Sequence, residues 1–172
     1  HLEGRACSSV DQFGMAQKGG AVTSHIRIAE SAQDIHCVRL TAGRADLLLG
    51  CDSLVAGSEL ALNTLNRGHS RVLINTHQAI TGQFVRNADL LFPAASLADR
   101  LTSAAGKDTV DFVDATALAT MLLGDSILSN LFMLGFAYQR GTIPVAATSI
   151  EQALAMNGVA VEANKNAFLW GR

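Results

Sequence analysis

Apolar and polar residues alternate along residues 21–29, whose sequence is AVTSHIRIA. Even-numbered positions from 22 to 28 carry mainly apolar side chains, whereas the odd-numbered positions carry Thr23, His25 and Arg27. Because successive side chains of a β-strand point to opposite faces, this alternation predicts a half-buried strand. The sequence of residues 5–10 predicts an earlier strand, and a loop over residues 13–20 connects this strand to the strand at residues 21–29.

Short apolar runs predict buried strands at residues 45–50 and 72–75, and residues 110–113 are predicted as a further strand. Segments with helical periodicity lie between and after them, at residues 53–65, 96–105, 115–123, 126–140, 148–156 and 159–170. The segment 126–140 is apolar nearly all round, which predicts a central packed helix. Strands that alternate with helices predict an α/β fold, a three-layer α/β/α sandwich with a mostly parallel, Rossmann-like sheet.

Polar residues mark where several of these helices should begin. Asp52 or Ser53 is placed to cap the helix after residue 50, and Asp125 follows a break in the helical pattern. Thr148 and Glu151 have the spacing of a capping box, which predicts that the helix over residues 148–156 begins there.

Composition and charge narrow the function classes. A chain of 172 residues suits one domain, and a net charge of −2 lacks the basic excess of nucleic-acid-binding proteins. No apolar run reaches the roughly 18 residues needed to span a bilayer, and no secretory leader opens the sequence. We therefore expect a cytoplasmic protein with neither a membrane nor a nucleic acid as its partner.

Cys7, Cys37 and Cys51 are widely spaced and form no CxxC motif. Their odd number and spacing argue against a disulfide framework and against an iron–sulfur cluster held by this chain alone. We expect all three to be buried thiols, since free cysteine is among the most buried residue types. The histidines form no HxH or HExxH frame, so we expect no metal site.

The loop before the alternating strand carries a basic residue and paired glycines. Paired glycines allow backbone N–H groups to approach an anion, while Lys18 and Arg27 add positive charge. The set suits a phosphate, a pyrophosphate or a carboxylate. The alternative is an ordinary glycine-containing turn with solvated basic side chains, since the loop lacks a P-loop or GxGxxG frame.

Asn75, Thr76 and His77 follow a predicted buried strand. Ligands of open α/β sheets bind beyond the carboxyl ends of the strands, so these residues are candidates to lie near a site. A histidine on a surface loop is the alternative interpretation of His77. No GxSxG motif occurs, which gives no support to a hydrolase serine.

Residues 13–28, FGMAQKGGAVTSHIRI, are similar to the G-x-A-Q-K-G-G-x-V-x-S-H-x-R signature of the gamma-type domain of 2-oxoacid:ferredoxin oxidoreductases. Within that family, the chain most resembles the indolepyruvate ferredoxin oxidoreductase branch. The resemblance extends over residues 45–68, 72–84, 122–144 and 150–172, in the same order. Domains of this family usually open with a strand, a Gly-rich turn and a helix ending in a segment like HLEG. Because this sequence starts at HLEG, we expect it to lack the first strand and the Gly-rich turn.

The resemblance implies a single gamma-type domain, residues 1–172, of an enzyme that decarboxylates an aryl pyruvate oxidatively to an acyl-CoA and passes electrons to ferredoxin. It implies no catalytic residue and no bound cofactor on this chain, which alone is expected to be inactive. Thiamine diphosphate, Mg²⁺ and iron–sulfur clusters belong to partner domains or subunits, with ferredoxin as an indirect partner and coenzyme A as co-substrate. A homodimer through surface normally covered by those partners is also expected.

The same resemblance assigns a coenzyme A or substrate surface to this chain. Its expected residues are Gln17, Lys18, Gly19, Gly20, Ser24, His25, Arg27, Asn75, Thr76 and His77. The alternative is a structural or assembly module of a pyruvate or 2-oxoglutarate ferredoxin oxidoreductase, in which the QKGG loop contacts a neighbouring domain.

Overall fold

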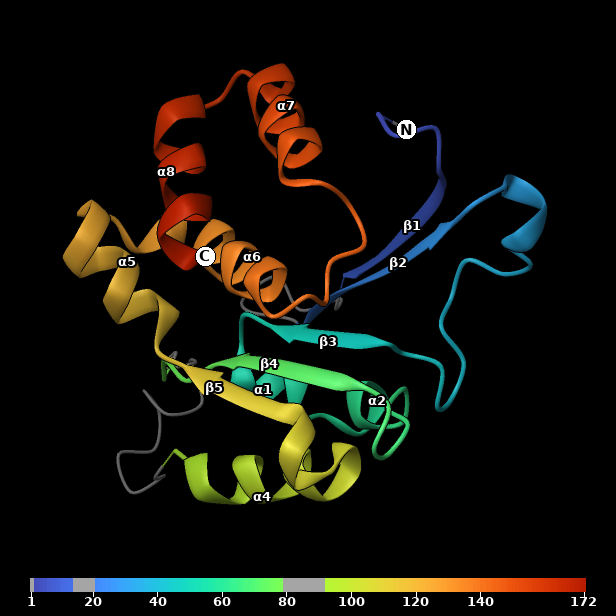
Figure 1. Ribbon diagram of the computed structural model, residues 1–172. Coiled ribbons are helices and arrows are strands. Elements are labelled where there is room, and N and C mark those ends of the chain that lie inside the picture. The colour runs from blue at the N-terminus through green and yellow to red at the C-terminus, as the bar shows by residue number, and fades with distance from the viewer. Residues whose placement is uncertain (1, 14–20, 79–91) are drawn as a thin grey trace.

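A three-stranded parallel sheet lies at the centre of the molecule (Figure 1). The computed structural model describes residues 2–13, 21–78 and 92–172. The sheet has the order β3–β4–β5, with β3 at Leu47–Gly50, β4 at Arg71–Asn75 and β5 at Val110–Val113. Central β4 pairs with both neighbours, so that Leu73 lies opposite Leu49 on one side and Asp111 on the other. All three predicted strands are confirmed, and β4 is the most buried of them.

Helices cover both faces of this sheet (Figure 1). One face carries α1 (Ser53–Ala56), α2 (Glu59–Leu62) and α4 (Ala94–Ala105), and the other carries α5 (Ala115–Leu123) and α6 (Ser129–Gln139). Helix α8 (Val161–Gly171) packs on α5 and α6, and α7 (Ala147–Asn157) packs on α8, farther from the sheet. Val72 and Ile74 of β4 join the apolar cluster on the α4 side, and Leu73 joins the cluster on the α6 side. This alternation along one buried strand produces the α/β sandwich that the sequence predicts.

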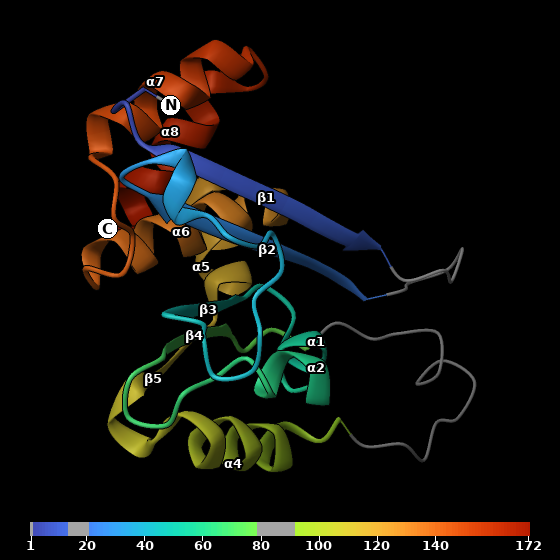
Figure 2. The ribbon, with the colours of Figure 1, turned by 90° about the vertical axis from the view of Figure 1, so that its right-hand side faces the viewer.

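The two N-terminal strands form a separate antiparallel hairpin, β1 (Ala6–Phe13) and β2 (Val22–Ala29). In Figures 1 and 2 it lies beside the β3 edge of the parallel sheet. As predicted, β2 is half-buried, and the more buried face is the polar one that carries Thr23, His25 and Arg27. Val22 and Ile26 of the opposite face remain 55% and 60% exposed. The hydrogen bonds of the polar face explain this orientation and are described with the candidate site.

The predicted helix over residues 53–65 is instead two single turns, α1 and α2. Asp52 caps α1 as predicted, by accepting two backbone N–H groups. Ser58 then accepts the N–H of Ala61 and starts a new turn, which interrupts the helix. A side chain at Gly57 would overlap Leu97 of α4, so glycine at this position allows α1 to approach that helix closely.

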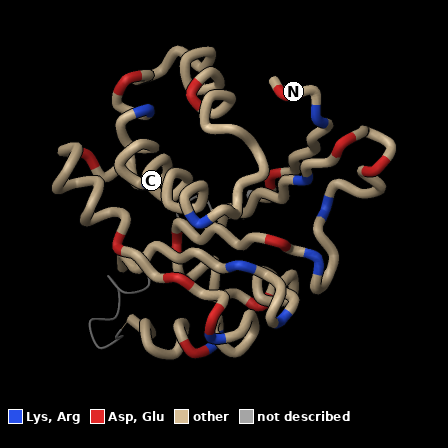
Figure 3. The backbone as a smooth tube through the Cα atoms, in the orientation of Figure 1, with Lys and Arg blue, Asp and Glu red and all other residues tan. Residues whose placement is uncertain are grey.

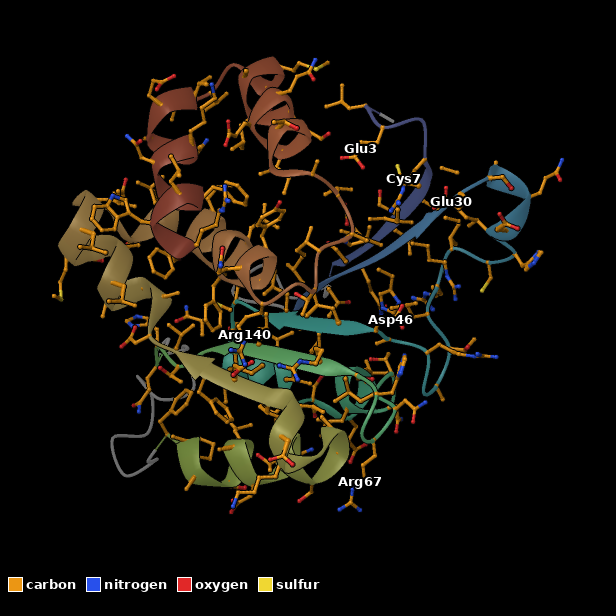
Figure 4. All side chains as sticks on the ribbon, in the orientation of Figure 1. Glu3, Cys7, Glu30, Asp46, Arg67 and Arg140 are labelled. Atoms are coloured by element: carbon orange, nitrogen blue, oxygen red, sulfur yellow. The ribbon has the colours of Figure 1, made fainter. Side chains whose placement is uncertain are left out.

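The capping box predicted for α7 is wrong. The helix begins at Ala147, which places Thr148 inside its first turn. Its cap comes from the other end of the chain, since a carboxylate oxygen of Glu3 accepts the N–H of Ala146 at 2.7 Å across 143 residues. Figure 4 shows Glu3 between the N-terminal segment and the loop that leads to α7. Arg5 strengthens this link by donating to the carbonyl of Pro144 at 2.7 Å.

Helices α6 and α8 cross in direct backbone contact at two glycines. A Cβ on Gly135 would overlap the carbonyl oxygen of Phe168, and a Cβ on Gly171 would overlap that of Phe132. Both glycines are buried, and so are Phe132 and Phe168. The central packed position predicted for residues 126–140 is therefore confirmed, and glycine is what permits it.

Replacing Gly135 with alanine should lower the free energy of unfolding by about 2–3 kcal/mol, because the added methyl group forces α6 and α8 apart. Urea unfolding of the isolated chain measures the change. Asn130→Ala is the control, since it lies exposed on the same helix and removes no close contact. Equal unfolding midpoints for Gly135→Ala and the control would contradict the close crossing.

The Glu3 cap should make stability depend on pH. A hydrogen bond from the Ser149 side chain, followed by the one from Ala146, lowers the pKa of Glu3 below its ordinary value of 4.5. Because the pKa of Glu3 is lower in the folded state, the ionised carboxylate stabilises the fold at pH values above about 4.5. This stabilisation is lost as the pH falls through the pKa of the folded state. Glu3→Gln should therefore be less stable than the parent at pH 7, with the difference vanishing in acid. A difference in unfolding midpoint that stays constant from pH 7 to pH 3 would exclude the cap.

Candidate functional site

The polar face of the hairpin is held by the irregular segment that follows it, residues 37–40, which we name the clamp segment. His25 accepts the backbone N–H of Leu40 at its Nδ1 atom, over 2.9 Å. Arg27 donates from Nη2 to the carbonyl oxygen of Arg39, over 3.0 Å. Two of the predicted site residues thus serve to fix the clamp segment against β2.

The clamp segment returns a side chain to the hairpin. Arg39 donates from Nη2 to the amide oxygen of Gln12 on β1, over 2.8 Å. Its carbonyl oxygen, already bonded to Arg27, also lies 3.2 Å from the Cys37 thiol. The Nε atom of Arg27 is buried without a hydrogen-bond partner among the described residues, so one charged donor in the clamp is unsatisfied.

Ser24 points to the opposite face of the hairpin from His25 and Arg27. Its hydroxyl donates to the carboxylate of Asp11, its cross-strand partner, over 2.7 Å. The hairpin therefore brings His25 and Arg27 together on the clamped face and leaves Ser24 on the exposed one. The predicted residues Gln17, Lys18, Gly19 and Gly20 lie outside the described residues.

The pair Phe13 and Val22 is the last described pair of the hairpin. Figure 2 shows that this end of the hairpin points toward the side of the molecule on which α1 and α2 lie. The clamp segment thus fixes the direction in which the hairpin presents its end.

Asn75 sits at the carboxyl end of β4, only 3% exposed, and uses its whole amide within the chain. Its Nδ2 donates to the carbonyl of Cys51 at 3.2 Å and to the hydroxyl of Thr116 at 2.8 Å. Its Oδ1 accepts the N–H of His77 at 3.3 Å and that of Ala115 at 3.1 Å. Both donors and both lone pairs are occupied, so Asn75 ties the end of β3 to the start of α5.

Thr76 and His77 are exposed at the same sheet edge. Thr76 continues the β4–β5 ladder by donating its N–H to the carbonyl of Val113 at 2.9 Å. Within residues 2–13, 21–78 and 92–172, no hydrogen bond joins this group to the clamped hairpin. The predicted residues thus form two groups, and a ligand-binding role for either group stays a prediction.

The cysteine prediction is wrong. Cys7, Cys37 and Cys51 are exposed, since they lie on the open face of the hairpin, in the clamp segment and just after β3. Partial burial of the Cys51 thiol, and next the neighbouring Asp52, raise its pKa, although the residue as a whole is exposed. Among the described residues, no three His, Cys, Asp or Glu side chains gather as metal ligands.

Charges of both signs are interspersed along the described chain (Figure 3). Several arginines are paired with carboxylates: Asp111 of β5 bonds Arg140 in a bidentate manner at 2.8 and 3.0 Å and Arg71 at 3.4 Å, and Arg5 pairs with Glu30 at 3.4 Å. Arg39 differs, because its acceptor is the neutral amide of Gln12. Sequence reasoning missed Arg39 and Gln12, since neither carries the quoted signature; a basic residue in the irregular segment after β2 was the available signal.

None of the helices in the described part of the chain is long and apolar enough to cross a membrane. The fold is similar to two crystal structures of bacterial proteins. One is pyruvate oxidoreductase subunit PORC from Thermotoga maritima, with 18% identity and a TM-score of 0.60. The other is the gamma subunit of a keto/oxoacid ferredoxin oxidoreductase from Geobacter sulfurreducens, with 17% identity and a TM-score of 0.62. Each comparison covers 99% of this chain and 80% of the other.

No curated protein sequence matches this chain. The family model described as pyruvate ferredoxin/flavodoxin oxidoreductase matches residues 1–172. The match spans the hairpin, the clamp segment, the parallel sheet and all the helices described above. The chain therefore belongs to the pyruvate ferredoxin/flavodoxin oxidoreductase family.

Proposed function

We propose that this chain is the gamma-type component of a 2-oxoacid:ferredoxin oxidoreductase and that it helps to bind coenzyme A. Residues 1–172 act as one domain of the assembled enzyme. The enzyme cleaves the carboxylate of an aryl pyruvate such as indolepyruvate as CO₂, transfers the acyl group to the thiol of coenzyme A and passes the electrons to ferredoxin. Family membership supports the reaction class. The similarity of residues 13–28 and 150–172 to the indolepyruvate branch supports the substrate.

The observation that carries the coenzyme A assignment is the clamp. Because His25 and Arg27 hold residues 37–40 against the hairpin, they fix the two strands that flank residues 14–20 in the sequence. Basic side chains with glycine N–H groups suit the phosphates of coenzyme A.

The redox cofactors belong to the partner components. Iron–sulfur clusters need grouped thiolates, and the described cysteines lie on three separate elements. The described residues do not fit a cluster or a metal ion, and no step of the reaction is assigned to such a group on this chain. Thiamine diphosphate, Mg²⁺ and the clusters are assigned to the partners by the resemblance. This chain supplies binding and positioning.

A second candidate function is a structural module that joins the subunits of a pyruvate or 2-oxoglutarate enzyme. The exposed face of the hairpin favours it, since Val22, Ile26 and Ile28 on that face of β2 are 55%, 60% and 38% exposed. Exposed apolar side chains that share one face are typical of protein interfaces. In this case residues 13–28 would affect assembly of the subunits and leave the affinity for coenzyme A unchanged.

Lys18→Ala in the complete enzyme should raise the KM for coenzyme A roughly tenfold and leave kcat near its original value, because a charge-assisted contact to a phosphate is lost. Arg27→Ala should raise the same KM and also lower the unfolding midpoint, since it releases Arg39. Steady-state kinetics with varied coenzyme A measure the first effect. Arg67→Ala is the control, because Arg67 is exposed far from the hairpin (Figure 4).

Gel filtration of the same variants with their partner subunits separates the two functions. An unchanged KM together with weakened assembly of Lys18→Ala would overturn coenzyme A binding and favour the structural module. A raised KM in fully assembled enzyme supports the proposal.

A further inference from the structure

We propose that Arg39 is an additional phosphate-binding residue at the end of the hairpin, and that it contacts a phosphate group of coenzyme A. The inference rests on the proposed function and adds a residue outside the signature that carries the family resemblance. Three observations support it: where the backbone of Arg39 is held, where its side chain reaches and what neutralises its charge.

The backbone of Arg39 is held by the clamp. Its carbonyl oxygen accepts the guanidinium of Arg27, and the N–H of the next residue, Leu40, is bonded to His25. Leu40 also packs against the apolar cluster around β4, so the clamp segment is anchored on the core as well as on the hairpin. The starting point of the Arg39 side chain is therefore fixed on two sides.

The side chain of Arg39 extends along the hairpin toward its end. Arg27 lies opposite Ser8 in the ladder, whereas Gln12, which accepts from Arg39, lies opposite Thr23. The next pair is Phe13 with Val22, the last that the structure describes. The Arg39 side chain thus runs along the hairpin from the Ser8–Arg27 pair to the Gln12–Thr23 pair, which is next to the last described pair.

The charge of Arg39 is not neutralised by a carboxylate in the described part of the chain. Arg71 and Arg140 share Asp111, and Arg5 pairs with Glu30. The guanidinium of Arg39 instead donates to the neutral side-chain amide of Gln12. Arg39 is exposed. The remaining N–H groups of its planar guanidinium match the spacing of two phosphate oxygens. An exposed, oriented and uncompensated guanidinium fits a phosphate better than a structural ion pair.

Coenzyme A offers two phosphate sources, the diphosphate bridge and the 3′-phosphate of the ribose. Dephospho-coenzyme A lacks only the latter and therefore distinguishes them. If Arg39 contacts the 3′-phosphate, replacing it affects coenzyme A alone; if it contacts the diphosphate, both compounds are affected. Either pattern supports a phosphate contact by Arg39.

The test compares Arg39→Gln with the parent in the complete enzyme. Arg39→Gln removes the charge and keeps a polar side chain that can still bond Gln12. The KM for coenzyme A should rise roughly tenfold at low salt, with kcat unchanged, and the ratio should shrink toward one as salt screens the contact. Arg39→Lys keeps the charge without the fork and should show a smaller increase. Arg44→Gln is the control, since Arg44 is an exposed arginine of the same irregular region.

The outcomes separate this inference from the proposed function. A KM unchanged by Arg39→Gln, while Lys18→Ala still raises it, overturns the role of Arg39 and leaves coenzyme A binding intact. If neither variant changes the KM, the proposed function fails and this inference fails with it. An equal rise in the KM for coenzyme A with Arg39→Gln and Arg44→Gln also overturns it, because the rise then reflects the loss of any positive charge in this region. A rise that does not depend on salt and appears with a lowered unfolding midpoint indicates a structural role and contradicts a phosphate contact.

Discussion

The hydrogen bonds between the hairpin and residues 37–40 are the constraint on which the candidate site depends. A two-stranded hairpin is marginally stable alone, and here one of its faces exposes Val22 and Ile26. His25 and Arg27 attach the other face to the clamp segment. Leu40 continues the connection, since its N–H bonds His25 while its side chain packs on the core around β4. His25 and Arg27, two polar residues of the family signature, thus have a structural role, since they attach the hairpin to the rest of the fold.

The same principle appears elsewhere in the fold. The side-chain amide of Asn75 uses all of its hydrogen bonds to join β3, β4 and α5. A residue predicted from the sequence to contact a ligand therefore holds the carboxyl edge of the sheet together. Glu3 caps α7 from the opposite end of the chain. Thr76 and His77 at the sheet edge and Arg39 in the clamp segment lie beside these braces and are exposed.

Local sequence signals predicted the elements well, because alternation, apolar runs and the Asp52 cap act within a few residues. Tertiary contacts decided the rest. The predicted capping box at Thr148 does not form, because α7 is capped by the carboxylate of Glu3, 143 residues from Ala146. No local sequence pattern could indicate so distant a partner. Likewise, the role proposed for Arg39 depends on the register that places Gln12 next to the last described pair of the hairpin. The signature predicts where a site would lie, but the division between bracing and exposed residues required the structure.

A structure of the complete enzyme with coenzyme A bound tests the central claim most directly. The account predicts a phosphate of coenzyme A within about 3 Å of the Arg39 guanidinium, with Arg27 still bonded to the Arg39 carbonyl and His25 to Leu40. Coenzyme A with all of its phosphates away from the hairpin, or a partner subunit covering Arg39 with a carboxylate in that position, would contradict it.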